Sequence, residues 1–468
     1  MSGEIPTIAE AARLIAAKRL SPVELTRACL DRVRTLDDRL HALIFCTEER
    51  ALAEARAAEA AIMAQGPSGP LHGIPIGLKD IVDTKGIPTT CQSKILAQNV
   101  PEADATCAAR LAAAGTVLIG KTTTHEFADG GPSFDLPWPP ARNPWDPDHF
   151  TAGSSSGTGA AVAAGMILGG IGTDTGGSIR GPAALCGIAG IKPTYGLVSR
   201  AGVAPAAYSL DHVGPMAWTA EDCALLLQAL AGHDPRDPAS ADRPVPDYTA
   251  LLDAGVGGLN IGVIHHFHEI DHKVGEATRR GIDAAIATLR GLGAEIREVH
   301  LSPLQDWMAC GSLISIAERA AAYEEWARTR LGDFSERVQR RLMLGALVSA
   351  VDYVQAVRRR RELRAELKTA MAGLDAVLTA VQPAEAPPIE SLPKWDVLEL
   401  PNFTMPFNIA GYPAISVCSG FGEGGLPVAI QLAVKPFAEP SLFRIADTFE
   451  KATDFRNKRP AITALVTP

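Results

Sequence analysis

The chain has 468 residues, of which 47% are hydrophobic and 21% are charged, and its formal net charge is −9. This is the composition of a globular protein that can bury a large core. No basic face interleaved with aromatic residues is visible, so we expect no nucleic-acid partner. The longest apolar stretch, residues 160–171, is too short to cross a bilayer, so no membrane partner is expected.

The N-terminus and the cysteines indicate a cytoplasmic protein. The first residues lack a basic region followed by an apolar run and a small-residue cleavage site, so no signal peptide is predicted. The eight cysteines are scattered and form no C-x-x-C pair. This usage is typical of reduced, buried thiols.

The first sixty or so residues predict helices. Residues 8–15 keep a helical period, and Ser21 is the expected cap of a second helix, with Pro22 at its first position and Glu24 at the capping-box spacing. Residues 70–91 alternate β-branched residues with Gly and Pro, which predicts strand and turn.

Helices and strands alternate through the rest of the chain. An Ala-rich helix is predicted over 103–114, and the short strand TVLIG follows it. Long helical patterns cover 274–292 and 314–372. The segments DAVLTAV, PAISVCSG and LPVAIQLAV read as later strands, the last two as neighbours joined by a Gly-rich turn. This alternation predicts an α/β layered fold.

Residues 115–122, GTVLIGKT, match the phosphate-loop pattern G-x-x-x-x-G-K-[ST]. In a true loop of this kind a strand precedes the first glycine, and the four variable residues form the phosphate cradle. Here the variable residues are themselves the predicted strand. We therefore expect no nucleotide hydrolase.

Two clusters of polar residues also need an interpretation. The arginines at 358–361 lie in a helical pattern and are expected to form a solvated face, partly paired with Glu362 and Glu366. The segment VIHHFHEIDH could form a metal site, but its spacing is not H-E-x-x-H, and a polar loop near a pocket mouth is the favoured interpretation. The residues concerned are His265, His266, His268, Glu269 and His272.

The segment GTDTGGSIRGP places a serine directly after two glycines. Gly176 and Gly177 allow a sharp turn that presents several backbone N–H groups near Ser178. Acyl transfer needs such a nucleophile with donors for the oxyanion. A plain glycine-rich turn with a surface serine fits this fragment equally well. No histidine is an obvious base, whereas Lys79 ends an apolar strand-like run and would be neutral if burial lowered its pKa.

Three blocks in order resemble the amidase signature family of hydrolases: LHGIPIGLKD at 71–80, TAGSSSGTGAAVAAG at 151–165 and GTDTGGSIRGPAALCGIAGIKPTYG at 172–196. Weaker similarity covers nearly the whole chain. The resemblance implies a single α/β/α layered domain over 1–468, with a central mixed sheet flanked by helices. Its expected parts are an N-terminal helical segment (1–65), a signature core (66–225), a variable helical part (226–395) and a C-terminal return to the sheet (396–468).

The resemblance also implies the roles of individual residues. Ser178 would be the nucleophile, Lys79 the base, and Ser154, which follows a cis peptide bond in the family, would pass a proton between them. The implied oxyanion donors are the backbone N–H groups of Thr175, Gly176, Gly177 and Ser178. The implied supporting residues are Ser155, Asp174 and Arg180. No cofactor and no metal are implied.

Three features favour a neutral, partly aromatic amide as substrate. Gly181 has no side chain to hold a polar substrate, and Phe403 lies in an apolar late loop. The loop that lines the pocket in this family carries aromatic residues here. Loop packing explains the apolar residues equally well. The predicted pocket residues are Gly130, Gly131, Phe134, Trp138, Gly181 and Phe403.

The implied activity is hydrolysis of a carboxylic amide, not a peptide bond, to an acid plus ammonia or an amine through an acyl-enzyme. Carbamates and esters are expected as side substrates. A small amide and water are the expected partners, and the resemblance suggests a homodimer. One alternative is the glutamine-hydrolysing A subunit of a tRNA-dependent amidotransferase, although residues 342–363 lack the small-residue, tyrosine-rich stretch associated with it. An inactive binding scaffold is disfavoured because all three triad residues are present.

Overall fold

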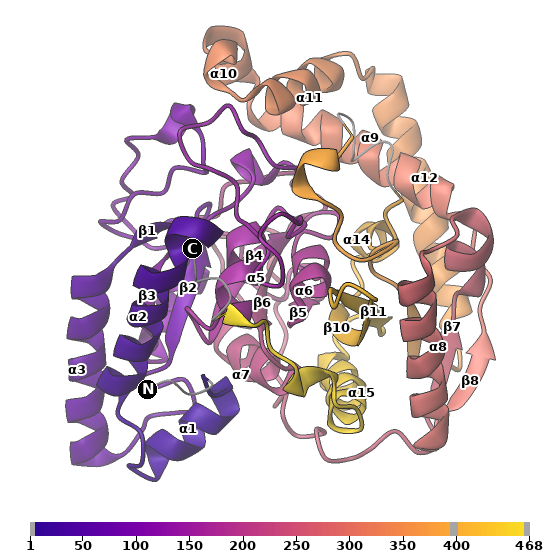
Figure 1. Cartoon of the computed structure of the whole chain (residues 1–468). Helices are drawn as coiled ribbons and strands as arrows, with labels where there is room; N and C mark the ends of the chain where they lie inside the picture. Colours follow the sequence, from indigo (N-terminus) through magenta and orange to yellow (C-terminus); the bar gives the residue numbers. More distant parts are fainter. Residues whose placement is uncertain (1–4, 394–400, 463–468) are drawn as a thin grey trace.

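The computed structural model describes residues 5–393 and 401–462, and in them a single mixed sheet runs through the molecule (Figure 1). Its strand order is β1-β3-β2-β4-β6-β5-β10-β11-β9-β7-β8. The strands are β1 (Leu43–Cys46), β2 (Pro75–Lys79), β3 (Val117–Thr122), β4 (Gly169–Asp174), β5 (Ala189–Lys192), β6 (His212–Ala217), β7 (Asn260–Val263), β8 (Glu295–Glu298), β9 (Ala376–Ala380), β10 (Ala414–Phe421) and β11 (Pro427–Ala433).

Helices flank this sheet, which confirms the predicted α/β architecture. Both parallel and antiparallel pairs occur, such as β2 with β4 and β10 with β11. The helices used below are α1 (Ile8–Ala16), α2 (Pro22–Leu40), α3 (Glu48–Gln65), α4 (Thr106–Ala113), α5 (Ser156–Ala163), α6 (Arg180–Cys186), α7 (Ala220–Leu230), α8 (Glu276–Gly291), α9 (Leu304–Ala322), α10 (Glu324–Thr329), α11 (Glu336–Ala346), α12 (Ala350–Ala370), α14 (Met405–Ala410) and α15 (Glu439–Lys451).

The predicted start of α2 is confirmed in detail. The Ser21 side chain accepts hydrogen bonds from the backbone N–H groups of Val23 and Glu24, and the Glu24 carboxylate accepts one from the Ser21 N–H. This capping box satisfies N–H groups that have no partner inside the helix. The first sixty residues are not purely helical, however, because the short strand β1 pairs with β3.

The region predicted as one long helix over 314–372 is divided into α9, α10, α11 and α12, which gather at the upper right of Figure 1. Two serines start new helices there. Ser335 accepts from the N–H of Val338, and Ser349 forms a capping box with Asp352. A serine hydroxyl competes with helix continuation by bonding the local backbone, which apolar periodicity alone does not report.

Glycines allow α5 to pack directly on the backbone of β4. A Cβ atom on Gly172 would lie 2.7 Å from the Ser155 Oγ, and one on Gly170 would lie 2.8 Å from Cγ2 of Thr158. Any side chain at these positions would push α5 away from the sheet. The residues that precede α5 are therefore held close to the carboxyl end of β4.

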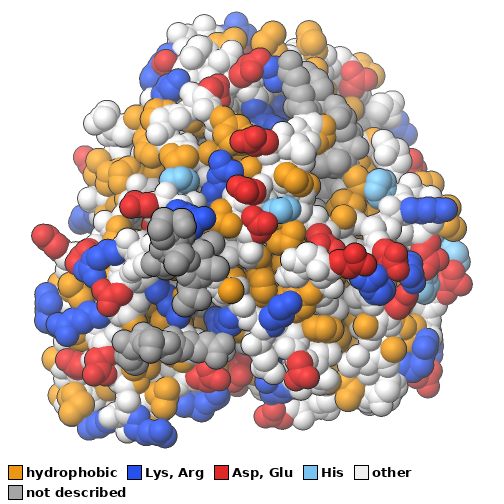
Figure 2. All heavy atoms as spheres, in the orientation of Figure 1, with side chains coloured by type: hydrophobic (Ala, Val, Ile, Leu, Met, Phe, Trp, Pro, Cys, Tyr) orange, Lys and Arg blue, Asp and Glu red, His pale blue; other side chains and the backbone are white. Residues whose placement is uncertain are grey.

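On the face of the molecule in Figure 2, no large area carries charges of only one sign. Acidic and basic side chains are interspersed there, with hydrophobic side chains between them (Figure 2). Among the described residues, no helix is both long and apolar enough to span a bilayer.

The stretch that matches a phosphate loop is strand β3, as predicted. Its lysine, Lys121, is fully buried, lies 3.0 Å from the Asp80 carboxylate and donates to the Thr89 hydroxyl at 2.6 Å. Asp80 is fully buried as well, and it accepts from the backbone and hydroxyl of Thr90. The lysine is therefore part of a buried ion pair.

Replacing Lys121 should destabilise the fold strongly. We expect Lys121→Met to lower the free energy of unfolding by about 3–5 kcal/mol, because Asp80 would remain buried without its counter-charge. Urea denaturation followed by circular dichroism measures this. The double variant with Asp80→Asn should recover part of the loss; a double variant no more stable than Lys121→Met would contradict the explanation.

Candidate active site

The parallel pairing of β2 and β4 brings Lys79 beside the signature serines. Ile76 pairs with Gly169 and Leu78 with Ile171, so the two strands end at the same edge of the sheet. Lys79 is the last residue of β2. Its Nζ donates to Ser154 Oγ at 2.7 Å and to Thr173 Oγ1 at 2.8 Å.

Burial changes the protonation of this lysine. Lys79 is fully buried and hydrogen bonded to two neutral hydroxyls. Burial lowers its pKa from 10.5 to about 7, although Asp174 and Asp211 act in the opposite direction. A neutral amine is therefore present at neutral pH, and it can accept a proton from Ser154.

Ser154 is fixed through its backbone. Its carbonyl oxygen accepts from the N–H of His125 at 3.1 Å and from the Thr124 hydroxyl at 3.0 Å. The peptide bond before it, Gly153–Ser154, is cis. A Cβ on Gly153 would collide with the His125 imidazole, so only glycine fits this position.

Ser155 connects three parts of the site. Its hydroxyl donates to the Thr173 carbonyl at 3.3 Å and accepts from the Thr173 N–H at 3.2 Å. Its own N–H donates to the carbonyl of Ser178 at 3.2 Å. The turn that carries Ser154 is thus tied both to β4 and to the segment of Ser178.

The carboxylate of Asp174 organises the glycine-rich segment. It accepts from the backbone N–H groups of Gly177 at 2.7 Å and Ile179 at 3.2 Å, and from the Arg180 guanidinium through Nε and a terminal nitrogen, both at 3.0 Å. Burial by itself raises the pKa of Asp174, but the charge and hydrogen bonds of Arg180 outweigh it and hold this pKa well below its usual value.

The loop from 175 to 178 is held from its other side by the segment that enters α14. The Gly176 carbonyl accepts from Asn402 Nδ2 at 2.8 Å and from Thr404 Oγ1 at 2.7 Å. The Thr175 hydroxyl donates to Asp211 at 2.6 Å. The loop is therefore fixed on both sides before any substrate binds.

The hydrogen bonds of this loop decide which of the predicted oxyanion donors can bind a ligand. The N–H of Gly177 already donates to Asp174, so it is not available to a ligand. Within the described residues, the N–H groups of Thr175, Gly176 and Ser178 donate to no hydrogen-bond acceptor. These three groups remain as candidate donors at the cavity.

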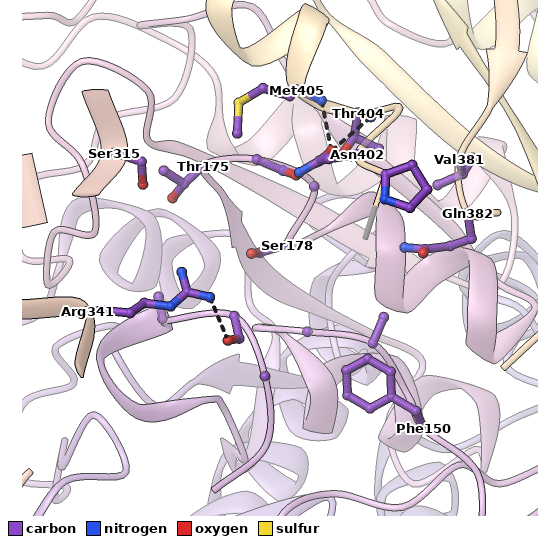
Figure 3. A pocket seen from close by; sticks show the side chains of 18 of the residues that line it. Phe150, Thr175, Ser178, Ser315, Arg341, Val381, Gln382, Asn402, Thr404 and Met405 are labelled. Carbon is purple, nitrogen blue, oxygen red and sulfur yellow. Dashed lines mark hydrogen bonds between the residues drawn. The ribbon is translucent and has the colours of Figure 1, made fainter. Parts of the chain in front are cut away.

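A cavity of about 170 Å³ opens above Ser178 (Figure 3). Ser178 lies at its centre in the view, with Phe150 and Gln382 on one side and Arg341 on the other. The described residues that line it, beyond the signature segments, come mainly from distant parts of the chain. Met405, from the apolar late loop, lines it as predicted from the sequence. Those that sequence analysis missed are Ala128, Phe150, Ser315, Arg319, Arg341, Val381, Gln382, Pro401, Asn402 and Thr404.

The predicted pocket residues are only partly brought together. Gly130 and Gly131 line the cavity, but Phe134, Trp138, Gly181 and Phe403 are not among its described lining residues. Phe134 is 57% exposed, whereas Phe403 is fully buried and packs against His272. The space beside Gly181 is occupied by Gln382, whose Nε2 would lie 2.8 Å from a Cβ atom there. A polar amide thus replaces the apolar wall that the sequence suggested.

One wall of the cavity carries two arginines. Arg319 from α9 and Arg341 from α11 both contact the buried carboxylate of Asp129, at 3.3 Å and 3.0 Å. No acidic residue is among the described lining residues of the cavity.

His125 lies in the second layer of the site and stays neutral. Its Nδ1 accepts from the N–H of Gly131 at 2.8 Å, and its ring stacks on Phe150 with centroids 6.0 Å apart. Burial, followed by the charge of Arg337, places its pKa well below the usual value. The imidazole therefore shapes the cavity wall near Ser154.

The histidine-rich segment separates into different environments. His265, His268 and Glu269 have ligand atoms within 4.8 Å of one another, while His266 stacks on His300 and His272 contacts Phe403. Burial lowers the pKa of His268 to about 4. The expectation of no metal at this segment stays a prediction.

Comparison with known proteins places this site in a family. The sequence profile described as Amidase matches residues 24–443. The chain belongs to the amidase family. The A subunit of glutamyl-tRNA(Gln) amidotransferase from Chloroflexus aggregans is 40% identical over an alignment 481 residues long, which covers 97% of this chain and 98% of that protein.

Solved structures of amidases share the fold. The peptide amidase of Stenotrophomonas maltophilia is 32% identical with a TM-score of 0.85, over 97% of this chain and 98% of that one. A structure described as a vestigial protein complex that reveals the origins of an s-triazine catabolic enzyme is 31% identical with a TM-score of 0.90, over 95% and 98% of the two chains. The predicted family and fold are confirmed.

The relatives correct the expected partners. We predicted a small amide and water, a possible homodimer and no nucleic acid, but the relatives at 40% identity are named as subunits of an enzyme with a tRNA in its name. The prediction from charge is wrong because net charge describes one chain alone. A protein that works inside a larger assembly needs no basic face of its own.

The pKa of Lys79 sets an expected pH profile for this family member. Below a pH of about 7 the amine is protonated and cannot accept the serine proton. We therefore expect kcat/KM for amide hydrolysis to rise by about tenfold per pH unit at acid pH. Above a pH of about 7 it should level off. A profile that is flat down to pH of about 5 would exclude Lys79 as the base.

Asn402 should act by positioning the loop of Ser178. We expect Asn402→Ala to lower kcat by about tenfold to a hundredfold with little change in KM, because the Gly176 carbonyl loses one of its two donors. Steady-state kinetics measures this, with Asn457→Ala, a substitution at an exposed turn, as the matched control. An unchanged kcat for Asn402→Ala would show that Thr404 alone fixes the loop.

Proposed function

We propose that the chain hydrolyses the C–N bond of a carboxamide through Ser178, Ser154 and Lys79. The observation that carries this proposal is the 2.7 Å hydrogen bond from the buried Lys79 to Ser154, which directly follows Gly153 in the wall of the cavity that Ser178 also lines. A buried lysine with a pKa of about 7 and only hydroxyl partners is suited to accept a proton, not to hold a structural charge.

The chemistry proceeds in two balanced halves. The Ser178 Oγ attacks the carbonyl carbon, its proton passes to Ser154, and the Ser154 proton passes to Lys79. The N–H groups of Thr175, Gly176 and Ser178 stabilise the oxyanion. The C–N bond breaks as the relay returns a proton to the leaving nitrogen. Water then attacks the acyl-enzyme with the same relay as base, which releases the acid and restores Ser178.

Glutamine is the first candidate substrate. This choice is supported by the relatives named as the A subunit of glutamyl-tRNA(Gln) amidotransferase. The similarity to them covers nearly the whole of both chains. Arg319 and Arg341 of the cavity wall support it as well, since a guanidinium can bind a carboxylate. In this proposal the chain is the amide-hydrolysing member of an assembly that passes ammonia to an acyl group on tRNA.

A second candidate is hydrolysis, by the chain alone, of an amide that has no free amino group. The favouring observation is that no carboxylate is among the described lining residues, so none of them can pair with the ammonium of glutamine. The likeness to a peptide amidase also supports it. The expected preference for neutral aromatic amides rested on Phe134, Trp138 and Phe403, which are not among the described lining residues. Phe150 is the aromatic residue among those that are.

Ammonia release distinguishes these candidates. We expect the purified chain, with and without candidate partner proteins, to release ammonia from glutamine, and Ser178→Ala to release none. A C-terminal peptide amide and an aryl amide are assayed beside it. Turnover of the peptide or aryl amide without turnover of glutamine would favour the second candidate. Full activity in Ser178→Ala would overturn the proposed mechanism.

A further inference from the structure

A second pocket, remote from Ser178, is lined by three arginines. It has a volume of about 360 Å³ and lies between α12, the end of α14 and the segment before α15. Arg360, Arg361 and Arg364 line it together with Tyr195, Ser209 and Phe437. We call it the arginine pocket. None of its described lining residues is acidic.

The three guanidiniums crowd one side of α12. Arg360 and Arg364 are four residues apart, a spacing at which like charges on a helix destabilise it. Burial lowers the pKa of Arg360, and the charge of Arg364 is the next cause. The acidic residues of the same helix are engaged elsewhere: Glu362 pairs with Arg359, and Glu366 accepts from Ser302.

Two of these arginines have no partner in the part of the chain that the structure describes. Arg361 and Arg364 make no ion pair and no hydrogen bond with residues 5–393 or 401–462, and both are exposed at the pocket rim. The sequence predicted that this run would be partly paired with Glu362 and Glu366. The pair with Glu362 is observed, and it is made by Arg359, which lies outside the pocket, whereas Glu366 accepts from Ser302.

Arg360 is fixed in place by neutral acceptors. Its Nε donates to the Ile409 carbonyl at 2.9 Å, and its terminal nitrogens donate to the Ser209 hydroxyl and carbonyl at 2.9 Å and 2.8 Å. Glu318 is the carboxylate that acts on it, but this group is not among the lining residues and accepts from Ser209 N and the Tyr353 hydroxyl. The guanidinium is thus pre-positioned with its charge only partly balanced.

The remaining walls are apolar and aromatic. Phe437 and Val357 close the pocket beside the arginines, and the Phe437 ring also makes a cation–π contact with Arg243 at 4.3 Å. Three positive charges in this volume call for a ligand with two or more negative charges in a short chain. Guanidinium groups match phosphate oxygens with paired hydrogen bonds, and an apolar wall can accommodate an attached ring.

We propose that the arginine pocket binds a phosphate chain, with its phosphates on Arg360, Arg361 and Arg364. Two sources offer this chemistry: the oligophosphate of a free nucleotide, and the phosphodiester backbone of an RNA. The sequence pattern that resembles a phosphate loop contributes nothing to this site, because it is the buried strand β3.

Calorimetric titration of the full chain with sodium pyrophosphate tests this proposal. We expect the Arg361→Gln/Arg364→Gln variant to bind at least about a hundredfold more weakly than wild type, with each lost charged hydrogen bond worth about tenfold. Arg358→Gln removes one positive charge from α12 outside the pocket and should bind within about twofold of wild type. Ammonia release from an amide should be unchanged in all variants, which verifies their folding.

Two further ligands identify the source. Parallel titrations with ATP and with a short single-stranded RNA at fixed ionic strength use the same variants. Binding of ATP that depends on Arg361 and Arg364 assigns the site to nucleotides, and RNA binding with that dependence assigns it to a nucleic-acid backbone. No pyrophosphate binding by wild type, equal binding by the double variant, or equally tight binding of sulfate would each overturn the proposal.

Discussion

The buried ion pair of Asp174 and Arg180 is the interaction on which the rest of the site depends. Asp174 ends β4 and Arg180 begins α6, so the pair closes the loop that carries Ser178. Arg180 also donates to the Thr404 carbonyl at 3.0 Å and to Gln431 of β11 at 2.9 Å. One guanidinium thus joins β4, the region of α14 and β11. Its charge is tolerated in the interior because Asp174 balances it and its N–H groups find hydrogen-bond acceptors.

Three buried lysines show why only one of them is suited to catalysis. Lys121 has the Asp80 carboxylate as counter-charge. Lys192 donates to the carbonyls of Pro193 and Tyr412, and burial holds its pKa well below the usual value, but its partners cannot exchange protons. Lys79 combines a lowered pKa with the exchangeable hydroxyl of Ser154. A depressed pKa becomes useful only where the neighbouring group can pass a proton to a cavity.

The resemblance to the amidase signature family named Lys79, Ser154 and Ser178 as candidates because it lies in short local segments. The glycines of these segments are required by close contacts, such as that of Gly153 with His125, so a sequence pattern can represent this part of the site. The cavity walls could not be predicted in this way, since Arg341 and Gln382 reach the site through tertiary packing of α11 and the end of β9. Composition identified an aromatic loop residue, but not that Phe134 faces solvent while Phe150 faces the cavity.

The short helix α14 connects the two charged centres of the molecule. Its Asn408 donates to the Asp174 carboxylate at 2.9 Å, and its next residue, Ile409, accepts from Arg360 of the arginine pocket at 2.9 Å. Thr404, directly before the helix, holds the Gly176 carbonyl. This short run of residues therefore links the arginine pocket to the loop of Ser178 through consecutive hydrogen bonds. Because these hydrogen bonds all end on residues 404–409, the same short stretch of backbone carries contacts of the oxyanion loop and of Arg360.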